Sequence, residues 1–204
     1  MSSKQHWETV YRTKASDAVS WHQANADISL ELIDSCNLRK DACLIDVGGG
    51  ASTLTDGLRS LGYKHLSVLD LSAAALSVAK TRLGENAKDI NWIEADITQI
   101  RMPEKGYDLW HDRAVFHFLT DQTQRDAYKA NLLRALKPHG HVIISTFADD
   151  GPTQCSNLPV VRYSPKSLSA EFSQNFMLIK HREEIHKTPS GVAQSFVYCH
   201  LQKK

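Results

Sequence analysis

The chain has 204 residues, of which 42% are hydrophobic, so it can bury one full core and suits a single domain over residues 1–204. Its 24 basic and 23 acidic residues leave a net charge of +1, which argues against a polyanion-binding surface and therefore against nucleic acid as a partner. The chain has neither an apolar signal segment at its N-terminus nor an apolar run of membrane-spanning length. We therefore expect a soluble cytoplasmic protein with no membrane partner.

The cysteines have no regular spacing. No Cys-x-x-Cys pair occurs, and two of the four lie inside apolar segments that predict strands; they are Cys36, Cys43, Cys155 and Cys199. This pattern predicts reduced thiols in the core, and neither a disulfide framework nor a metal site is expected.

The first 27 residues are polar and rich in aromatic side chains, among them Trp7, Tyr11 and Trp21. The simplest interpretation of these aromatic residues is the hydrophobic packing of an N-terminal helix. Apolar residues then recur with helical periodicity at Ile28, Leu32, Ile33 and Cys36. They predict a helix with one buried face.

A glycine-rich turn follows a short apolar run at residues 42–47. The run predicts a buried parallel strand. Gly48 and Gly50 lack a Cβ, so they tolerate a tight turn and let a ligand lie against the backbone. Ser52 is the expected N-cap of the next helix, whose free N–H groups would then face that ligand.

An acid, Asp70, ends the next apolar run about 20 residues beyond the glycines. Nucleotide-binding α/β folds place there the carboxylate that accepts hydrogen bonds from a ribose diol. The alternative is a cap at the strand end, since Ser72 begins a helix two residues later. A third acid, Asp96, follows the apolar run at residues 90–93.

The rest of the chain alternates expected strands and helices, which predicts βαβ crossovers and a parallel sheet. The loop at residues 111–119 follows the strand at 107–110 and should border the ligand. Beyond it we expect a helix capped by Thr120 or Asp121 and ended by Pro138 and Gly140, a strand at 142–145, a long loop at 148–163, a helix from Ser164, and strands at 176–184 and 192–202. Long irregular loops are uncommon in compact domains unless they are functional.

The pattern Asp46-x-Gly48-x-Gly50-x-Ser52 resembles the first motif of class I S-adenosylmethionine (SAM) methyltransferases, with serine in place of the last glycine. A dinucleotide-binding fingerprint would instead require glycine where Thr53 stands. The resemblance implies a Rossmann-like α/β fold: a mostly parallel seven-stranded sheet with a C-terminal antiparallel hairpin and helices on both faces. It also implies SAM as the cofactor.

The same resemblance implies roles for individual residues. Asp46, Gly48 and Gly50 would contact the cofactor, Asp70 with Leu71 its ribose, and Asp96 with Ile97 its adenine. Asp112 would touch the amino-acid end of the cofactor. Two other functions are alternatives to a SAM methyltransferase. One is a nicotinamide-dependent reductase, which would also need a Tyr-x-x-x-Lys pair that is absent from the chain. The other is a SAM-binding module without catalysis.

The N-terminal segment, residues 1–27, resembles the leader of the lysine methyltransferases that act on elongation factor 1A or citrate synthase, through Trp7-Glu8-x-x-Tyr11 and Ser20-Trp21-His22. In those families it forms a lid, so Trp7 and Trp21 would cover the cofactor. Those elongation-factor enzymes carry Asp-Lys-Gly-Thr where this chain has Asp112-Arg113-Ala114-Val115. The loop at 148–163 loosely resembles that of small-molecule and tellurite-resistance methyltransferases. A small acceptor (thiol, chalcogen or amine) is therefore the first hypothesis, and a protein lysine is the alternative.

Methyl transfer from a sulfonium needs no metal, because the electrophile is already charged and the protein mainly orients the acceptor. An amine or thiol acceptor also needs a base. The candidates are His111, His117 and Asp112, although a histidine between phenylalanines is often a packing residue. The sequence indicates no particular oligomeric state.

Overall fold

The computed structural model describes residues 3–204. Its elements follow the expected alternation of strands and helices along most of the chain. They are α1 (Ser3–Thr13), α2 (Asp27–Asp34), β1 (Cys43–Val47), α3 (Leu54–Ser60), β2 (His65–Asp70), α4 (Ala73–Leu83), η1 (Gly84–Asp89), β3 (Ile90–Glu94), β4 (Tyr107–Arg113), η2 (Phe116–Phe118), α5 (Gln122–Ala135), β5 (Leu136–Phe147), β6 (Gln154–Cys155), β7 (Leu158–Pro159), α6 (Pro165–Phe172), β8 (Phe176–Lys187) and β9 (Ala193–Lys203).

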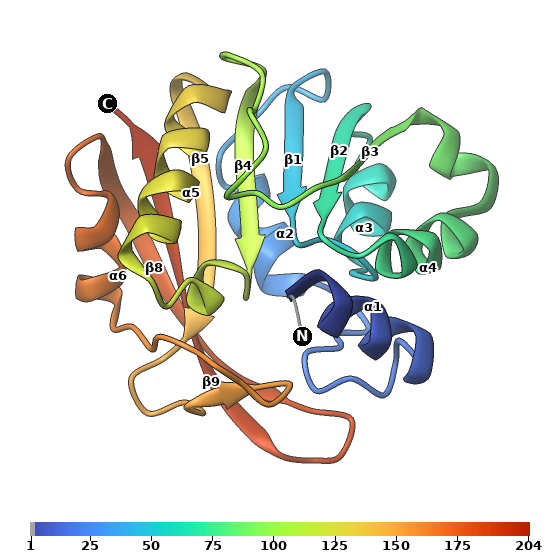
Figure 1. Ribbon diagram of the computed structural model, residues 1–204. Helices are drawn as coiled ribbons and strands as arrows, with labels where there is room; N and C mark the ends of the chain where they lie inside the picture. The colour runs from blue at the N-terminus through green and yellow to red at the C-terminus, as the bar shows by residue number, and fades with distance from the viewer. Residues whose placement is uncertain (1–2) are drawn as a thin grey trace.

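Seven strands form one sheet in the order β3-β2-β1-β4-β5-β9-β8 (Figure 1). The first five are parallel, whereas β9 pairs antiparallel with both β5 and β8. This arrangement confirms the predicted Rossmann-like methyltransferase sheet and its C-terminal hairpin. The chain reverses its direction of winding between β1 and β4, and in open α/β sheets ligands bind outside the carboxyl ends of strands at such a point.

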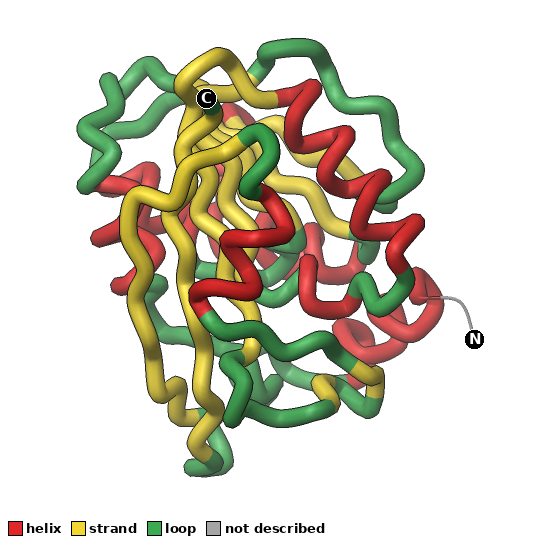
Figure 2. The backbone as a smooth tube through the Cα atoms, turned by 90° about the vertical axis from the view of Figure 1, so that its left-hand side faces the viewer, coloured by secondary structure: helices red, strands yellow, loops and turns green. Residues whose placement is uncertain are grey.

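Helices cover both faces of the sheet, as the view along it shows (Figure 2). On one face α5 and α6 bury Tyr128, Leu132, Leu168 and Phe172. On the other face α2 and α3 bury Leu32, Ile33, Leu54 and Leu58. The central strands are therefore shielded on both sides, which is why they are near-continuous apolar segments in the sequence.

Several details of these elements differ from the expectation. Helix α3 begins at Leu54, so its N-cap position is Thr53 and not Ser52, although the Ser52 hydroxyl still accepts the Leu54 N–H at 3.1 Å. Strand β5 begins at Leu136, because α5 passes directly into extended backbone, and Pro138 and Gly140 lie inside the strand. The loop at 148–163 contains a short hairpin, β6–β7, whose turn uses the left-handed residues Ser156 and Asn157.

In the described part of the chain no helix has the length and apolar character needed to cross a membrane.

Candidate active site

The glycine turn lies between β1 and α3, at the carboxyl edge of the sheet. Gly48 and Gly50 have φ angles of +71° and +20°, in the region that favours glycine. A Cβ on Gly48 would collide with the Val115 side chain, and one on Gly50 would lie 2.5 Å from Oδ2 of Asp70. The turn therefore lies close to the ends of both neighbouring strands, β2 and β4.

Asp46 and His111 lie beside each other on β1 and β4. Nδ1 of His111 is 2.7 Å from Oδ1 of Asp46, and its Nε2 is 2.9 Å from the hydroxyl of Ser29 on α2. All three residues are buried. Both ring nitrogens of His111 are thus engaged, whereas Oδ2 of Asp46 is buried and has no hydrogen-bond partner among residues 3–204.

A cavity of about 60 Å³ lies at this edge. It is lined by the N-terminal segment, the glycine turn and the end of β4, through Tyr11, Ser16, Val19, Trp21, His22, Gln23, Asp46, Gly48, Gly49, Ala51, Ser52, Thr53, His111 and Arg113. The cavity therefore joins the Asp46 carboxylate to the leader segment.

Arg113 supplies the positive charge of this cavity. Its Nε donates to the Tyr198 hydroxyl at 2.8 Å and its Nη1 to the Trp21 carbonyl at 3.2 Å. Its buried Nη2 has no hydrogen-bond partner among residues 3–204, although the Glu184 carboxylate lies 3.6 Å away. The residues of the cavity thus include one acceptor and one donor without a hydrogen bond, Oδ2 of Asp46 and Nη2 of Arg113, the latter ion-paired with Glu184.

Asp70 ends β2 and is only 8% exposed. Burial is the main cause that raises the pKa of its carboxyl to about 7. Its Oδ1 accepts the Ser72 N–H at 2.8 Å, so part of the capping interpretation holds. Helix α4, however, is capped by the Ser72 hydroxyl, which accepts the Ala75 N–H at 3.1 Å. Leu71 is the half-buried residue between Asp70 and this cap.

Asp96 and Ile97 follow β3. Oδ1 of Asp96 accepts both the backbone N–H of Thr98 at 2.8 Å and its hydroxyl at 2.7 Å. Ile97 is 4% exposed and belongs to the core beneath α5. The pair therefore has the same arrangement as Asp70 and Leu71, with an acid in a tight turn beside an apolar side chain.

Asp112 lies inside β4, which runs three residues beyond the expected strand end. Its side chain is fully buried and accepts the N–H groups of Val115 and Phe116 and the hydroxyl of Tyr128, at 2.8, 3.1 and 2.6 Å. Burial raises the pKa of this carboxyl to about 6. Asp112 thereby holds the turn that leads to His117.

His117 is fully buried and contacts the loop at residues 148–163. Its carbonyl accepts the Val161 N–H at 2.8 Å, and its Nδ1 accepts the Phe147 N–H at 3.3 Å. Nε2 has no hydrogen-bond partner among residues 3–204. Burial lowers the pKa of the ring to about 3, so the imidazole is neutral at physiological pH and carries its proton on Nε2.

The N-terminal helix α1 lies across the carboxyl edge of the sheet (Figure 1). Its Trp7 ring contacts Trp21 and Phe118, with centroids 5.6 and 5.2 Å apart. Its Glu8 carboxylate accepts the Ala74 N–H at the start of α4, at 3.2 Å. His6 also reaches the loop at residues 148–163, where its Nε2 lies 3.1 Å from the Ser156 hydroxyl. Residues 3–13 of the N-terminal segment are thus helical and packed over the site.

The sequence did not predict two residues of this site, Ser29 and Arg113. Ser29 lies in an amphipathic helix and has no neighbouring motif. Arg113 could have been found, because it directly follows Asp112 at the end of a central strand, where α/β folds place their ligand contacts.

Comparison with known proteins agrees with the fold. Residues 44–140 match the family model described as a methyltransferase domain. The eEF1A lysine and N-terminal methyltransferase of Mus musculus is 23% identical over 152 residues, which cover 72% of this chain and 22% of that protein. The ubiquinone/menaquinone biosynthesis C-methyltransferase UbiE of Shewanella piezotolerans is 26% identical over 120 residues, which cover 57% of this chain and 47% of that protein.

Solved structures resemble the chain over nearly its whole length. The 1,6-didemethyltoxoflavin-N1-methyltransferase of Burkholderia thailandensis, bound to 1,6-didemethyltoxoflavin and S-adenosylhomocysteine, has a TM-score of 0.75 at 16% identity and covers 98% of this chain and 87% of its own. NodS of Bradyrhizobium japonicum, an N-methyltransferase in complex with S-adenosylhomocysteine, has a TM-score of 0.71 at 18% identity, with coverages of 97% and 98%. At these identities the likeness shows the fold.

The sheet order and the glycine turn define a SAM-dependent methyltransferase fold. Over residues 44–140 the chain matches a methyltransferase domain, and its similarity to methyltransferase relatives supports membership of the class I SAM-dependent family, whose cofactor is SAM. It spans about a fifth of the eEF1A methyltransferase and about half of UbiE.

Proposed function

We propose that this protein transfers the methyl group of SAM to a small-molecule acceptor, a thiol, a chalcogen or an amine. The observation that carries the proposal is the closed acceptor side. Helix α1 and the β6–β7 hairpin meet over the site through His6 and Ser156, and the ring of Trp7 packs against Phe118. A side chain carried by a folded protein would need an open channel, whereas a small acceptor can be enclosed.

The amino-acid end of SAM fits the two unpartnered groups of the cavity. Its ammonium group can donate to Oδ2 of Asp46, and its carboxylate can accept from Nη2 of Arg113. Both atoms are buried and lack hydrogen-bond partners among residues 3–204, and unpaired buried polar groups are costly. Two opposite charges at one cavity suit a zwitterion.

The remaining cofactor contacts follow the carboxyl edge of the sheet. Gly48 and Gly50 let the turn pack closely against Val115 and Asp70, where a Cβ would collide, and we assign the backbone of this turn to the cofactor. Asp70 would accept hydrogen bonds from the ribose diol beside Leu71. Asp96 would accept from the adenine amino group, with Ile97 against the ring, and Trp7 and Trp21 would cover the cofactor.

SAM supplies a methyl group that is already electrophilic, so the chain has to orient the acceptor and exclude water. Asp112 fixes the turn after β4 through Val115 and Phe116. His111 holds Asp46, since both of its ring nitrogens are engaged. His117, with its unpartnered Nε2, is therefore the histidine that we assign to the acceptor.

The buried His117 favours one kind of acceptor. An imidazole whose pKa lies near 3 is a weak base and would remove a proton from an ammonium group inefficiently. Its Nε2–H can instead donate a hydrogen bond to an anion. A thiolate or a chalcogen oxyanion fits this donor better than an amine.

Methylation of a protein lysine is the second candidate. It is supported by the aromatic leader around Trp7 and Trp21 and by the 23% identity to the eEF1A lysine and N-terminal methyltransferase. If the leader swings aside, the acceptor side would open to a peptide.

Incubation with methyl-labelled SAM decides between these functions. The protein is supplied with thiols, chalcogen oxyanions and amines in separate reactions, and with heat-treated cell extract in another, with Asp70→Asn as the control. We expect label in a small-molecule product. Label in extract protein alone would support lysine methylation, and binding of SAM without any transfer would support a non-catalytic module.

A further inference from the structure

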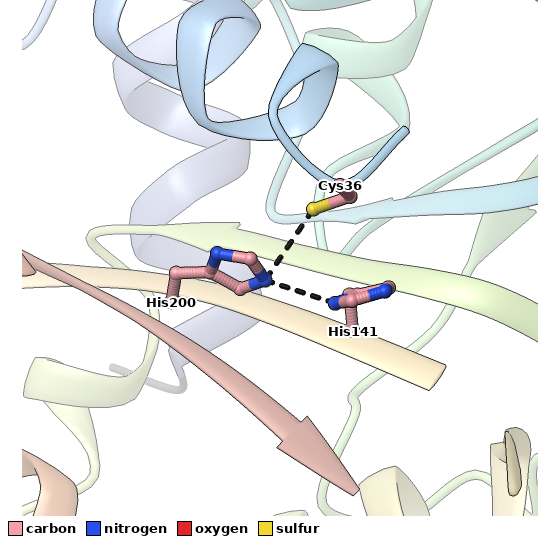
Figure 3. Close-up of side chains that lie close together, drawn as sticks. All are labelled: Cys36, His141 and His200. Atoms are coloured by element: carbon pink, nitrogen blue, oxygen red, sulfur yellow. Dashed lines mark hydrogen bonds between the residues drawn. The ribbon is translucent and has the colours of Figure 1, made fainter. Parts of the chain in front are cut away.

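A cluster of one cysteine and two histidines lies beneath the C-terminal end of α2, away from the glycine turn (Figure 3). Cys36 follows α2, His141 lies on β5 and His200 on β9. Sγ of Cys36 is 3.4 Å from Nε2 of His200, which is 2.9 Å from Nδ1 of His141. The three atoms all lie within 4.8 Å of one another. Three distant segments thus bring a thiol and two imidazole nitrogens to one point.

Two hydrogen-bond patterns fit this cluster: Nε2 of His200 can donate to Nδ1 of His141, or it can accept from Cys36 or His141. Each neutral imidazole has one N–H and one lone pair in the plane of its ring. Nε2 of His200 nevertheless faces two polar atoms, while the thiol of Cys36 has another acceptor, the Leu32 carbonyl at 3.3 Å. If Nε2 accepts from either neighbour, Nδ1 holds the ring proton and the lone pair of Nε2 points into the cluster.

The spacing of these atoms is close to that of a metal site. Nitrogen and sulfur ligands at their usual distances around a tetrahedral zinc ion lie about 3.3–3.6 Å apart. The contacts of 2.9 and 3.4 Å therefore need only a small opening. His200 is 2% exposed, whereas Cys36 and His141 are half-buried, so an ion can enter from the surface and lose most of its water.

The chemistry of the donors selects the class of ion. One thiolate and two imidazoles are the ligands of zinc and copper(I), whereas magnesium and calcium prefer oxygen.

We propose that Cys36, His141 and His200 bind a transition-metal ion of the Zn²⁺ or Cu⁺ class, with a fourth position open to water. The ion would fasten the end of α2 to β5 and β9. Because Ser29 on the same helix contacts His111, the site would also steady the helix that supports the Asp46–His111 pair. This function is separate from methyl transfer and does not depend on the acceptor.

Metal titration of the full chain, stripped of metal with a chelator, tests the proposal. We expect one Zn²⁺ per chain by calorimetry and, with Co²⁺ as a spectroscopic probe, a thiolate charge-transfer band. Removing groups that merely support a ligand costs about 10–100-fold in affinity, so Cys36→Ser and His200→Gln should each weaken Zn²⁺ binding by more than about 100-fold. The matched control is Cys43→Ser, which changes another half-buried free cysteine and should keep both signals.

Competition with a Cu⁺ chelator under reducing conditions distinguishes Cu⁺ from Zn²⁺ as the preferred ion. The melting temperature should rise with the bound ion in the parent and in Cys43→Ser but not in Cys36→Ser. His141→Gln, at a more exposed ligand, serves if His200→Gln does not fold. Absence of saturable binding of both ions, or binding that Cys36→Ser and His141→Gln leave unchanged, would overturn the proposal.

Discussion

Oδ1 of Asp46 lies 2.7 Å from Nδ1 of His111, between the adjacent parallel strands β1 and β4. This bond orients the carboxylate and uses one of its oxygens. The other oxygen, Oδ2, is left buried and unpartnered among residues 3–204. Four of the five polar side-chain atoms of Asp46, His111 and Ser29 have a partner within the protein, and the fifth, Oδ2, belongs to a residue that lines the cavity.

Replacing this carboxylate should weaken the binding of the amino-acid end of the cofactor only. Asp46→Asn removes the charge that we assign to the ammonium group of SAM, so SAM binding should fall by about 1.5–3 kcal/mol, the usual worth of a hydrogen bond to a charged group. Binding of 5′-methylthioadenosine, which lacks the amino-acid end, should not change. Calorimetry with both ligands checks this.

Arg113→Gln should give the same selective loss through the cofactor carboxylate. Asp41→Asn is the control, since Asp41 is an exposed carboxylate paired with Arg39. Equal loss of both ligands in Asp46→Asn would place Asp46 away from the amino-acid end.

The second prediction concerns the ribose. A carboxylate that faces a diol accepts two hydrogen bonds, so Asp70→Ala should weaken SAM binding by about 2–4 kcal/mol. The fold should survive, because α4 has its own cap in Ser72. If affinity stays the same and the melting temperature falls, the role of Asp70 is to accept the Ser72 N–H.

The affinity for SAM should also depend on pH through Asp70. Burial raises the pKa of this carboxyl to about 7, so below that pH it is largely protonated and accepts the diol poorly. Binding of the ribose favours the charged form, and the affinity should therefore rise from pH 6 to pH 8. Calorimetry across this range measures the rise. Asp70→Asn has no proton to lose there, so a rise that persists in this variant belongs to another group.

Much of the fold was predictable because local signals and the global arrangement agree. The apolar run before Gly48, the acid at Asp70 and the late hairpin each have a fixed place in a parallel sheet closed by an antiparallel strand. Boundaries were less predictable where polar residues are buried. Strand β4 continues through His111, Asp112 and Arg113 because each of these side chains finds a partner, on β1, α5 and β9 respectively, and the sequence alone does not reveal those partners.

The candidate site was predictable where residues follow strands and not where distant segments meet. Ser29 meets His111 across 82 positions of the chain, and Cys36 meets His200 across 164. The cysteine spacing therefore predicted no metal site, since two of the proposed ligands are histidines on β5 and β9. The properties of His117 were also not predictable from the sequence. Burial lowers its pKa to about 3, and two neighbouring phenylalanines do not reveal that burial.

The leader should open to admit the cofactor. The cavity of about 60 Å³ beneath it is smaller than typical ligand pockets, which are about 300–1,000 Å³, so α1 has to move. Its polar contacts with the domain include those of Glu8 with Ala74 and of His6 with Ser156, and an ion pair between Lys4 and Glu94 that is largely exposed and therefore weak.

Hydrogen exchange measures this opening directly. Amides of residues 7–21 should exchange faster in the free protein and become protected when S-adenosylhomocysteine is added. Trp7→Ala should increase exchange in the free state, because it removes the ring contacts with Trp21 and Phe118. Equal protection with and without ligand would leave Trp7 and Trp21 as packing residues.

The two histidines should separate cofactor binding from turnover. His111→Gln disturbs the orientation of Asp46, so it should raise the SAM concentration needed for half-maximal rate and leave the saturated rate nearly unchanged. His117→Gln should lower the saturated rate by about 10²–10³-fold, the usual effect of losing a preorganised hydrogen-bond donor, with SAM affinity unchanged. Because the pKa of His117 lies near 3, the ring stays neutral from pH 5 to pH 8 and should add no ionisation to the rate profile in that range.

Steady-state kinetics of both variants across this range tests the assignment. Full turnover in His117→Gln would mean that the ring only packs between Phe118 and Phe147, and the acceptor would then be bound without it.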